Sequence, residues 1–279
     1  MPIIDSHHHL WDPAIRRHAW LDGLPQIAGR YGIDDLRPLA EEAGVVGTVL
    51  VQVLGSVDET REFLATAAAE PLIRGVVGWV DLTDPGVADT LAELKEAPGG
   101  DLLVGIRHLA QDEPDRSWLA RDDVRRGVAA VGAAGLAYDL LVKPSQLDAA
   151  YDLAASLPEV RFVLDHLGKP DIEHDDLDAW RPGFERLASL PHVAAKVSGI
   201  LTEAGDDRSV AALVPAVRTA VESFGPHRLM IGSDWPVSLL AEPYPVVMER
   251  LTATLRAVGV EGTALQAVHG DTASAWYRL

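Results

Sequence analysis

The chain has 279 residues, of which 48% are hydrophobic and 24% charged, and its formal net charge is -18. This composition is typical of a folded globular protein, and the excess negative charge argues against nucleic acid or an anionic membrane surface as a partner. The chain contains no cysteine, which excludes disulfides, thiolate metal sites and a cysteine nucleophile, and leaves His, Asp and Glu as the ligands for any metal.

The N-terminal segment MPIIDSHHHLWD has neither the basic region nor the apolar stretch of a secretion signal. No later segment is a run of about 18 uncharged apolar residues. We therefore expect a cytoplasmic protein whose partner is a small molecule, and the sequence is compatible with a homo-oligomer.

Eight short apolar segments rich in Val, Ile and Leu alternate with helix-like segments. The predicted strands are Ile3–Asp5, Val45–Gln52, Ile73–Trp79, Leu102–Arg107, Ala137–Val142, Arg161–Leu164, Val193–Val197 and Leu229–Gly232. Val57–Ala69 and Val210–Phe224 have the mixed 3 and 4 spacing of amphipathic helices. Eight such units predict an α/β protein with a (β/α)8 TIM barrel, with an open doubly wound sheet as the alternative. No Gly-, Ser- or Pro-rich linker divides the chain, so we predict that residues 1–279 form one domain.

The first predicted strand leads into three successive histidines. Because side chains alternate along a strand, His7 and His9 face one side and His8 the other. Neutral imidazole is the commonest metal-ligating side chain, so this pair predicts a site for a divalent ion. A His-rich surface turn is the structural alternative. We expect no chemical role for His8.

The fourth predicted strand ends in Arg107 and His108. In a TIM barrel the reactive groups lie at the carboxyl ends of the strands, and a guanidinium group can hold an oxygen through paired donors. We predict substrate contacts there, and a structural ion pair of Arg107 is an equally good interpretation. Other polar or aromatic candidates at or beside strand ends are Gln52, Lys143, Trp11, Trp79 and Trp235.

The sixth and eighth predicted strands also end in polar residues. The sixth runs into LDHLGKP, where alternation allows only one of Asp165 and His166 to face the barrel, and we predict His166. The eighth runs into MIGSDWP, where Asp234 precedes Pro236, a residue that cannot continue a strand. The carboxylate of Asp234 is well placed as a general base, and capping of the next helix is the alternative.

Six ordered segments extend this pattern over nearly the whole chain. DSHHHLWDP, VVGWVDL, GIRHLAQDEPD, LDHLGKP, KVSG and IGSDWPV together resemble the sugar-lactonase and dicarboxylate-lactonase branch of the amidohydrolase superfamily. The resemblance implies an amidohydrolase-type barrel and a hydrolase that opens a small polar lactone, with sugar (aldono) lactones of carbohydrate metabolism as the expected substrates.

The resemblance also implies roles for particular residues. One divalent ion, Zn²⁺ or Mn²⁺, is expected at His7, His9, His166 and Asp234. His166 and Asp234 are expected to be catalytic, and Arg107 and His108 to contact the substrate. Members with two metals need a bridging Lys or Glu on strand four and a His on strand five. Because strand four ends in Arg107 and strand five in LVKP, we expect at most one ion, which some members of the branch do not need.

The expected reaction is attack on the lactone carbonyl by a water that Asp234 deprotonates. The histidine cluster, or a metal bound to it, stabilises the oxyanion. The alternatives are a dicarboxylate lactone hydrolase, a metal-dependent decarboxylase of an aromatic acid, and a barrel that binds a sugar acid without catalysis. The complete set of three histidines and one aspartate disfavours the last of these.

Overall fold

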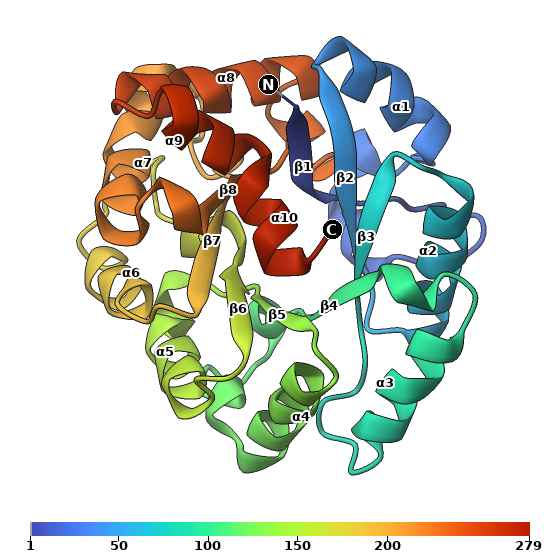
Figure 1. Cartoon of the computed structure of the whole chain (residues 1–279). Helices are drawn as coiled ribbons and strands as arrows, with labels where there is room; N and C mark the ends of the chain where they lie inside the picture. The colour runs from blue at the N-terminus through green and yellow to red at the C-terminus, as the bar shows by residue number, and fades with distance from the viewer. Residues whose placement is uncertain (1) are drawn as a thin grey trace.

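The computed structural model describes residues 2–279 as eight parallel strands surrounded by helices (Figure 1). The strands are β1 (Ile3–His8), β2 (Val45–Val51), β3 (Ile73–Gly78), β4 (Leu103–His108), β5 (Ala137–Leu140), β6 (Arg161–Leu164), β7 (Val193–Val197) and β8 (Leu229–Ile231). The helices are α1 (Ile33–Glu42), α2 (Val57–Ala69), α3 (Val87–Glu96), α4 (Asp122–Ala133), α5 (Leu147–Ser156), α6 (Arg181–Ala188), α7 (Val210–Phe224), α8 (Tyr244–Ala257), α9 (Gly262–Gln266) and α10 (Thr272–Tyr277).

The strands pair in chain order, each parallel to the next. This arrangement confirms the (β/α)8 barrel that the spacing of the apolar segments predicts. The bounds of β6, β7, α2 and α7 are those expected from the sequence, and the other strands differ at one or both ends. Among residues 2–279, no helix combines the length and apolar character needed to cross a bilayer.

The barrel closes between β8 and β1 through the residues that follow β8. The backbone amide of Asp234 donates to the carbonyl of His7 (2.8 Å), and the amide of His9 donates to the carbonyl of Trp235 (2.7 Å). Closure therefore occurs at the carboxyl ends of the two strands and places Asp234 beside the histidines of β1.

The buried carboxylate of Asp5 holds this junction together. It accepts hydrogen bonds from the backbone amide (2.8 Å) and hydroxyl (2.6 Å) of Ser233. It also accepts from the hydroxyl of Tyr244 on α8 (3.0 Å). The residue before Asp234 is thus attached to the middle of β1.

The C-terminal helix α10 blocks the other end of the barrel. Figure 1 shows it lying across the barrel next to the start of β1. Its Ala273 and Tyr277 pack with interior side chains such as Val49 and Met230, and the hydroxyl of Tyr277 donates to Asp139 inside the barrel (2.7 Å). The carboxyl ends of the strands, opposite α10, are the end at which Asp234 and the histidines of β1 lie.

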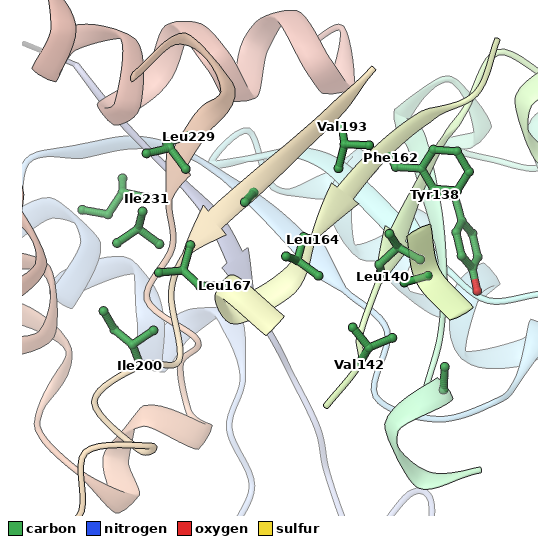
Figure 2. Close-up of a cluster of buried hydrophobic side chains, with 14 of the residues drawn as sticks. Tyr138, Leu140, Val142, Phe162, Leu164, Leu167, Val193, Ile200, Leu229 and Ile231 are labelled. Carbon is green, nitrogen blue, oxygen red and sulfur yellow. The ribbon is translucent and has the colours of Figure 1, made fainter. Parts of the chain in front are cut away.

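Side chains on the outer faces of the strands form the main core beneath the helices. Figure 2 shows part of it, including Tyr138, Phe162 and Leu164, and the rings of Tyr138 and Phe162 meet edge to face with centroids 6.1 Å apart. Each fully buried side chain of this kind contributes about 1.5 to 3 kcal/mol. Because alternate residues point outward, Asp139 on β5 and Lys196 on β7 point into the barrel.

Candidate active site

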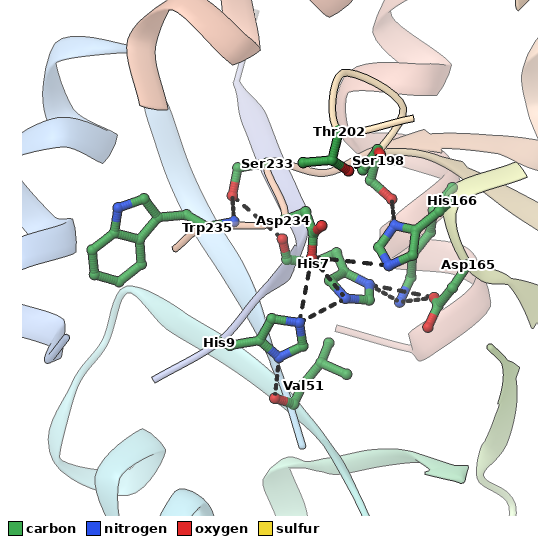
Figure 3. A network of polar contacts seen from close by, with 12 residues as sticks. His7, His9, Val51, Asp165, His166, Ser198, Thr202, Ser233, Asp234 and Trp235 are labelled. Atoms are coloured by element: carbon green, nitrogen blue, oxygen red, sulfur yellow. Dashed lines mark hydrogen bonds and ion pairs between the residues drawn. The ribbon is translucent and has the colours of Figure 1, made fainter. Parts of the chain in front are cut away.

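Four side chains that the sequence predicts to be functional meet at the carboxyl end of the barrel (Figure 3). Nε2 of His7 lies 3.1 Å from Nε2 of His9. Oδ1 of Asp234 lies 3.4 Å from Nε2 of His9, 3.6 Å from Nε2 of His7 and 3.9 Å from Nε2 of His166. All four residues are buried, so the cluster forms the floor of a site shielded from bulk water.

Neighbouring groups orient the rings of the cluster. Nδ1 of His9 lies 2.8 Å from the carbonyl oxygen of Val51 at the end of β2. Because a carbonyl only accepts, this nitrogen carries the ring hydrogen and Nε2 of His9 presents a lone pair. Nδ1 of His166 contacts the hydroxyl of Ser198 (2.9 Å), which follows β7. Both rings therefore direct Nε2 toward Asp234.

Asp165 and His166 both face the site, so the expectation that only one of them points inward is wrong. Strand β6 ends at Leu164, and the alternation rule does not extend past it. His166 has a φ of 54°, in the left-handed region, which turns its side chain to the same side as that of Asp165. Oδ2 of Asp165 accepts from Nη1 of Arg107 (3.0 Å).

Arg107 lines the pocket and is at the same time a member of a buried ion pair. Besides its bond to Asp165, its Nη2 donates to the backbone carbonyl of Gln52 (2.6 Å). The side-chain amide of Gln52 donates back to the carbonyl of Arg107 (3.2 Å). The structure therefore places Gln52 behind Arg107, where it orients the guanidinium group and does not line the pocket.

His108 and Trp79 lie outside the pocket, because alternation along β4 turns His108 outward when Arg107 points inward. The ring of His108 stacks on Trp118 with centroids 4.0 Å apart. Its Nδ1 accepts from Nε1 of Trp79 (3.1 Å), and its Nε2 donates to Glu113 (2.8 Å). These bonds occupy both ring nitrogens, so the geometry gives no support to the predicted substrate contacts of His108 and Trp79.

A cavity of about 330 Å³ lies above the cluster. His9, His166, Asp234 and Arg107 contribute polar groups, and Gln111, Asp112 and Lys169 add others. The remaining lining is apolar and consists of Trp11, Trp20, Leu24, Val53, Leu109, Leu141 and Val237. Trp11 thus lies where the sequence suggests, whereas Trp235 is buried and contacts Tyr31 edge to face (5.5 Å).

The ionisation of the cluster follows from burial and from its own charges. Burial alone raises the pKa of Asp234, but His166, His9 and His7 more than offset this effect and hold its pKa below the ordinary value. Burial lowers the pKa of His166 to about 4 and that of His7 well below its ordinary value. At neutral pH the site therefore holds an ionised carboxylate beside the uncharged imidazoles of His7 and His166.

The same side chains suit one divalent ion. Ligand atoms of His7, His166 and Asp234 lie within 4.8 Å of one another, and Nε2 of His9 offers a further lone pair. Imidazole nitrogens with a carboxylate oxygen are a donor set for Zn²⁺ or Mn²⁺. Within residues 2–279 no second group of this kind is found.

Two charged residues of the site were not identified from the sequence. Lys196 and Asp139 are fully buried inside the barrel, and Nζ of Lys196 lies 2.6 Å from Oδ2 of Asp139. Burial raises the pKa of Asp139 to about 6, although Lys196 opposes the shift. The available signal was a charged residue within the apolar segments VAAKV and AYDL.

A further buried carboxylate supports the wall of the pocket. Glu59, on α2, accepts hydrogen bonds from the backbone amides of Val53 (2.8 Å) and Leu54 (2.9 Å), which follow β2. Burial raises the pKa of Glu59 to about 7 from an ordinary value of 4.5, against the effect of these two bonds.

We expect Glu59→Gln to change how stability depends on pH. Between pH 4.5 and about 7 the carboxyl group ionises in the unfolded chain but stays protonated in the folded protein, so folding loses free energy as the pH rises. Gln keeps the acceptor and removes the ionisation. Relative to the wild type, the variant should gain up to about 3 kcal/mol between these limits, measured by urea unfolding.

Glu62→Gln is the control for this measurement, because Glu62 lies on the same helix and its side chain is half exposed. It should differ from the wild type by no more than about 0.5 kcal/mol at either pH. A Glu59→Gln curve parallel to that of the wild type would show that Glu59 is ionised throughout this range.

Comparison with known proteins gives consistent matches over the full chain. A sequence model of the amidohydrolase family matches residues 4–279. The L-fucono-1,5-lactonase of Burkholderia multivorans is 38% identical over 290 residues, which cover 99% of this chain and 96% of that protein. A crystal structure of an amidohydrolase from Burkholderia multivorans with bound zinc has a TM-score of 0.93, at 36% identity and 100% coverage of both chains. A putative 2-pyrone-4,6-dicarboxylic acid hydrolase from Pseudomonas putida has a TM-score of 0.74, at 26% identity and coverage of 99% and 97%.

Proposed function

Because the chain belongs to the amidohydrolase family, we propose that it is a hydrolase that opens the ring of a sugar lactone. The observation that carries this proposal is the cluster of His7, His9, His166 and Asp234 at the floor of a pocket. The similarity to a fuconolactonase over nearly the whole chain supports it. The partner is then a small molecule, and the net charge of -18 disfavours nucleic acid and anionic membranes.

In the proposed reaction Asp234 acts first as a base and then as an acid. Its ionised carboxylate accepts a proton from the water whose oxygen bonds to the lactone carbonyl carbon. When the bond from that carbon to the ring oxygen breaks, Asp234 returns the proton to the ring oxygen, and the product is a hydroxy acid. The lowered pKa of Asp234 makes this return to a basic alkoxide strongly favourable.

The other polar groups stabilise charge and orient the ring. Nη1 of Arg107 lies 3.3 Å from Nε2 of His7, so the guanidinium group lies beside the cluster and can donate to an oxyanion formed there. A single zinc or manganese ion held by His7, His9, His166 and Asp234 would polarise the carbonyl as a Lewis acid when bound. The zinc bound in the Burkholderia structure supports this assignment.

The pocket lining favours an uncharged and partly apolar substrate. Seven of its residues are apolar, which suits the methyl group that a 6-deoxy lactone such as L-fucono-1,5-lactone carries in place of a hydroxymethyl group. The two cationic side chains of the lining are already paired, Arg107 with Asp165 (3.0 Å) and Lys169 with Glu203 (3.5 Å). A dicarboxylate would need cations that are free to bind it.

We expect L-fucono-1,5-lactone to be the best substrate in a panel measured by proton release. L-galactono-1,5-lactone differs from it by one added hydroxyl, which must be buried against the apolar wall, and kcat/KM should be about 10-fold lower. A pyrone dicarboxylate should be slower still. Faster turnover of the dicarboxylate than of every sugar lactone would reverse this ranking. Release of carbon dioxide from an aromatic acid, without lactone turnover, would replace the proposal by a decarboxylase.

A further inference from the structure

The two sides of the pocket differ in polarity. Because the strands follow chain order around the barrel and β8 closes onto β1, the loops after β8, β1 and β2 form one side, and the loops after β4, β5 and β6 form the other. Apart from the cluster, the lining residues of the first side are all apolar, and they are Trp11, Trp20, Leu24, Val53 and Val237. The second side has two leucines together with Gln111, Asp112 and Lys169.

The segment that follows β1 supplies most of the apolar side and is firmly attached at its ends. The backbone of Trp11 pairs with that of Tyr31 through two hydrogen bonds (3.1 and 2.9 Å). Nε1 of Trp11 donates to the carbonyls of Ile27 (3.2 Å) and Gly29 (3.0 Å). The ring of Trp20 meets that of Trp11 edge to face, with centroids 5.1 Å apart. Trp20 is therefore held by packing, and its partly exposed ring can contact an apolar group of a ligand.

The proposed reaction orients a 1,5-lactone relative to these two sides. Asp234 returns a proton to the ring oxygen, so this oxygen must lie beside Asp234, at the junction of β8 and β1. The ring oxygen is bonded to C5, which carries the C6 group. The C6 group therefore lies on the apolar side of the pocket. The carbons on the far side of the ring, C2 to C4, direct their hydroxyls toward the loops after β4 and β6.

The groups on that second side suit hydroxyls. The amide of Gln111 offers a donor and an acceptor, Asp112 an acceptor and Lys169 a donor. Nζ of Lys169 lies 3.5 Å from Glu203, and this pair leaves other ammonium hydrogens for a neutral ligand. The polarity of the pocket thus agrees with the orientation that the position of Asp234 requires.

We propose that Trp20 and Leu24 are specificity-determining residues that contact the C6 group and favour methyl over hydroxymethyl there. This assignment rests on the proposed function, because the orientation of the lactone follows from the role of Asp234. A methyl group gains from leaving water for an apolar wall. The pocket would then select lactones of 6-deoxy sugars.

A hydroxymethyl group would bury its hydroxyl without a partner on this side. The only polar side-chain atoms among the five apolar lining residues are the two indole nitrogens. Nε1 of Trp11 already donates to two carbonyls, and Nε1 of Trp20 is shielded from solvent. Leaving a hydroxyl unpaired in such a place is costly.

Trp20→Ala tests the assignment through the ratio of kcat/KM for L-fucono-1,5-lactone to that for L-galactono-1,5-lactone, expected to be about 10 in the wild type. The space left by the indole admits a water beside the hydroxymethyl group, so the ratio should fall to about 2 or less, with a higher KM for L-fucono-1,5-lactone. Trp20→Phe keeps an aromatic ring and should retain the wild-type ratio. Ile15→Ala is the control, because Ile15 lies in the same segment, is 75% exposed and does not line the pocket.

Leu24→Asn is a second variant, because loss of the indole could prevent folding, which circular dichroism checks. Its amide can bond to the hydroxymethyl group, and the ratio should fall by about 5-fold. An unchanged ratio in either folded variant, or an equal loss of kcat/KM for both lactones in Trp20→Ala, would overturn the assignment alone. No turnover of any lactone by the wild type would instead overturn the proposed function and this assignment with it.

Discussion

Asp234→Asn should lower kcat for lactone hydrolysis by about 10²- to 10⁴-fold, the usual contribution of a positioned general base. Asn has the shape of Asp, but it cannot take a proton from water. The backbone of Asp234 has a φ of 58°, a conformation that Asn tolerates well. Proton release during steady-state turnover measures the loss, and circular dichroism checks the fold.

Asp58→Asn is a suitable control for this substitution. Asp58 is an exposed residue of α2 that pairs with Arg61 and does not line the pocket. Its replacement should leave kcat at the wild-type value. If Asp234→Asn kept most of the activity at neutral pH, Asp234 would not be the base, and the cluster would have to act on water in another way.

The barrel itself could be predicted from apolar periodicity. Segments of almost wholly buried residues, such as Arg161–Leu164 and Val193–Val197, have the predicted bounds. The prediction fails at the carboxyl ends, where apolar residues continue beyond the strand. Val142 packs in the main core although β5 ends at Leu140, so an apolar residue after a strand is buried like one within it.

Positions within the site could be predicted only as far as the chain remains extended. Alternation correctly separates His8 from His7 and His9. Applied in the same way to β4, it places His108 on the face opposite Arg107, which is where the structure has it. It fails after β6, because the left-handed backbone of His166 is a tertiary feature that no local pattern of apolar residues indicates.

Lys196 and Asp139 show a second limit of predicting the site from the sequence. Each interrupts an apolar strand, which shows that a charge must be buried but does not name its partner. The two residues are 57 positions apart in the sequence, and only the closure of the barrel brings them together. The same closure adds Asp165 and Arg107, so two cations and two carboxylates balance in a region without bulk water.

Asp165→Asn should lower the free energy of unfolding by about 3 to 5 kcal/mol, because removing one partner of a buried ion pair leaves a charge uncompensated. Asp165 contacts both Arg107 (3.0 Å) and Lys196 (3.0 Å). Burial raises the pKa of Asp165, but Lys196, His7 and Arg107 lower it well below the ordinary 3.8. Its contribution is therefore present above pH 3.8 and decreases as the pH falls below that value.

Urea unfolding at pH 7 measures the loss, which corresponds to a decrease in Tm on the order of 10 °C. Asp148→Asn is the matched control, since Asp148 pairs with Arg186 (2.7 Å) on the surface, where its side chain is 78% exposed. Such a pair contributes about 1 kcal/mol or less. Equal losses in the two variants would mean that Arg107 and Lys196 find other compensation when Asp165 is neutral, and that the four buried charges do not depend on one another for stability.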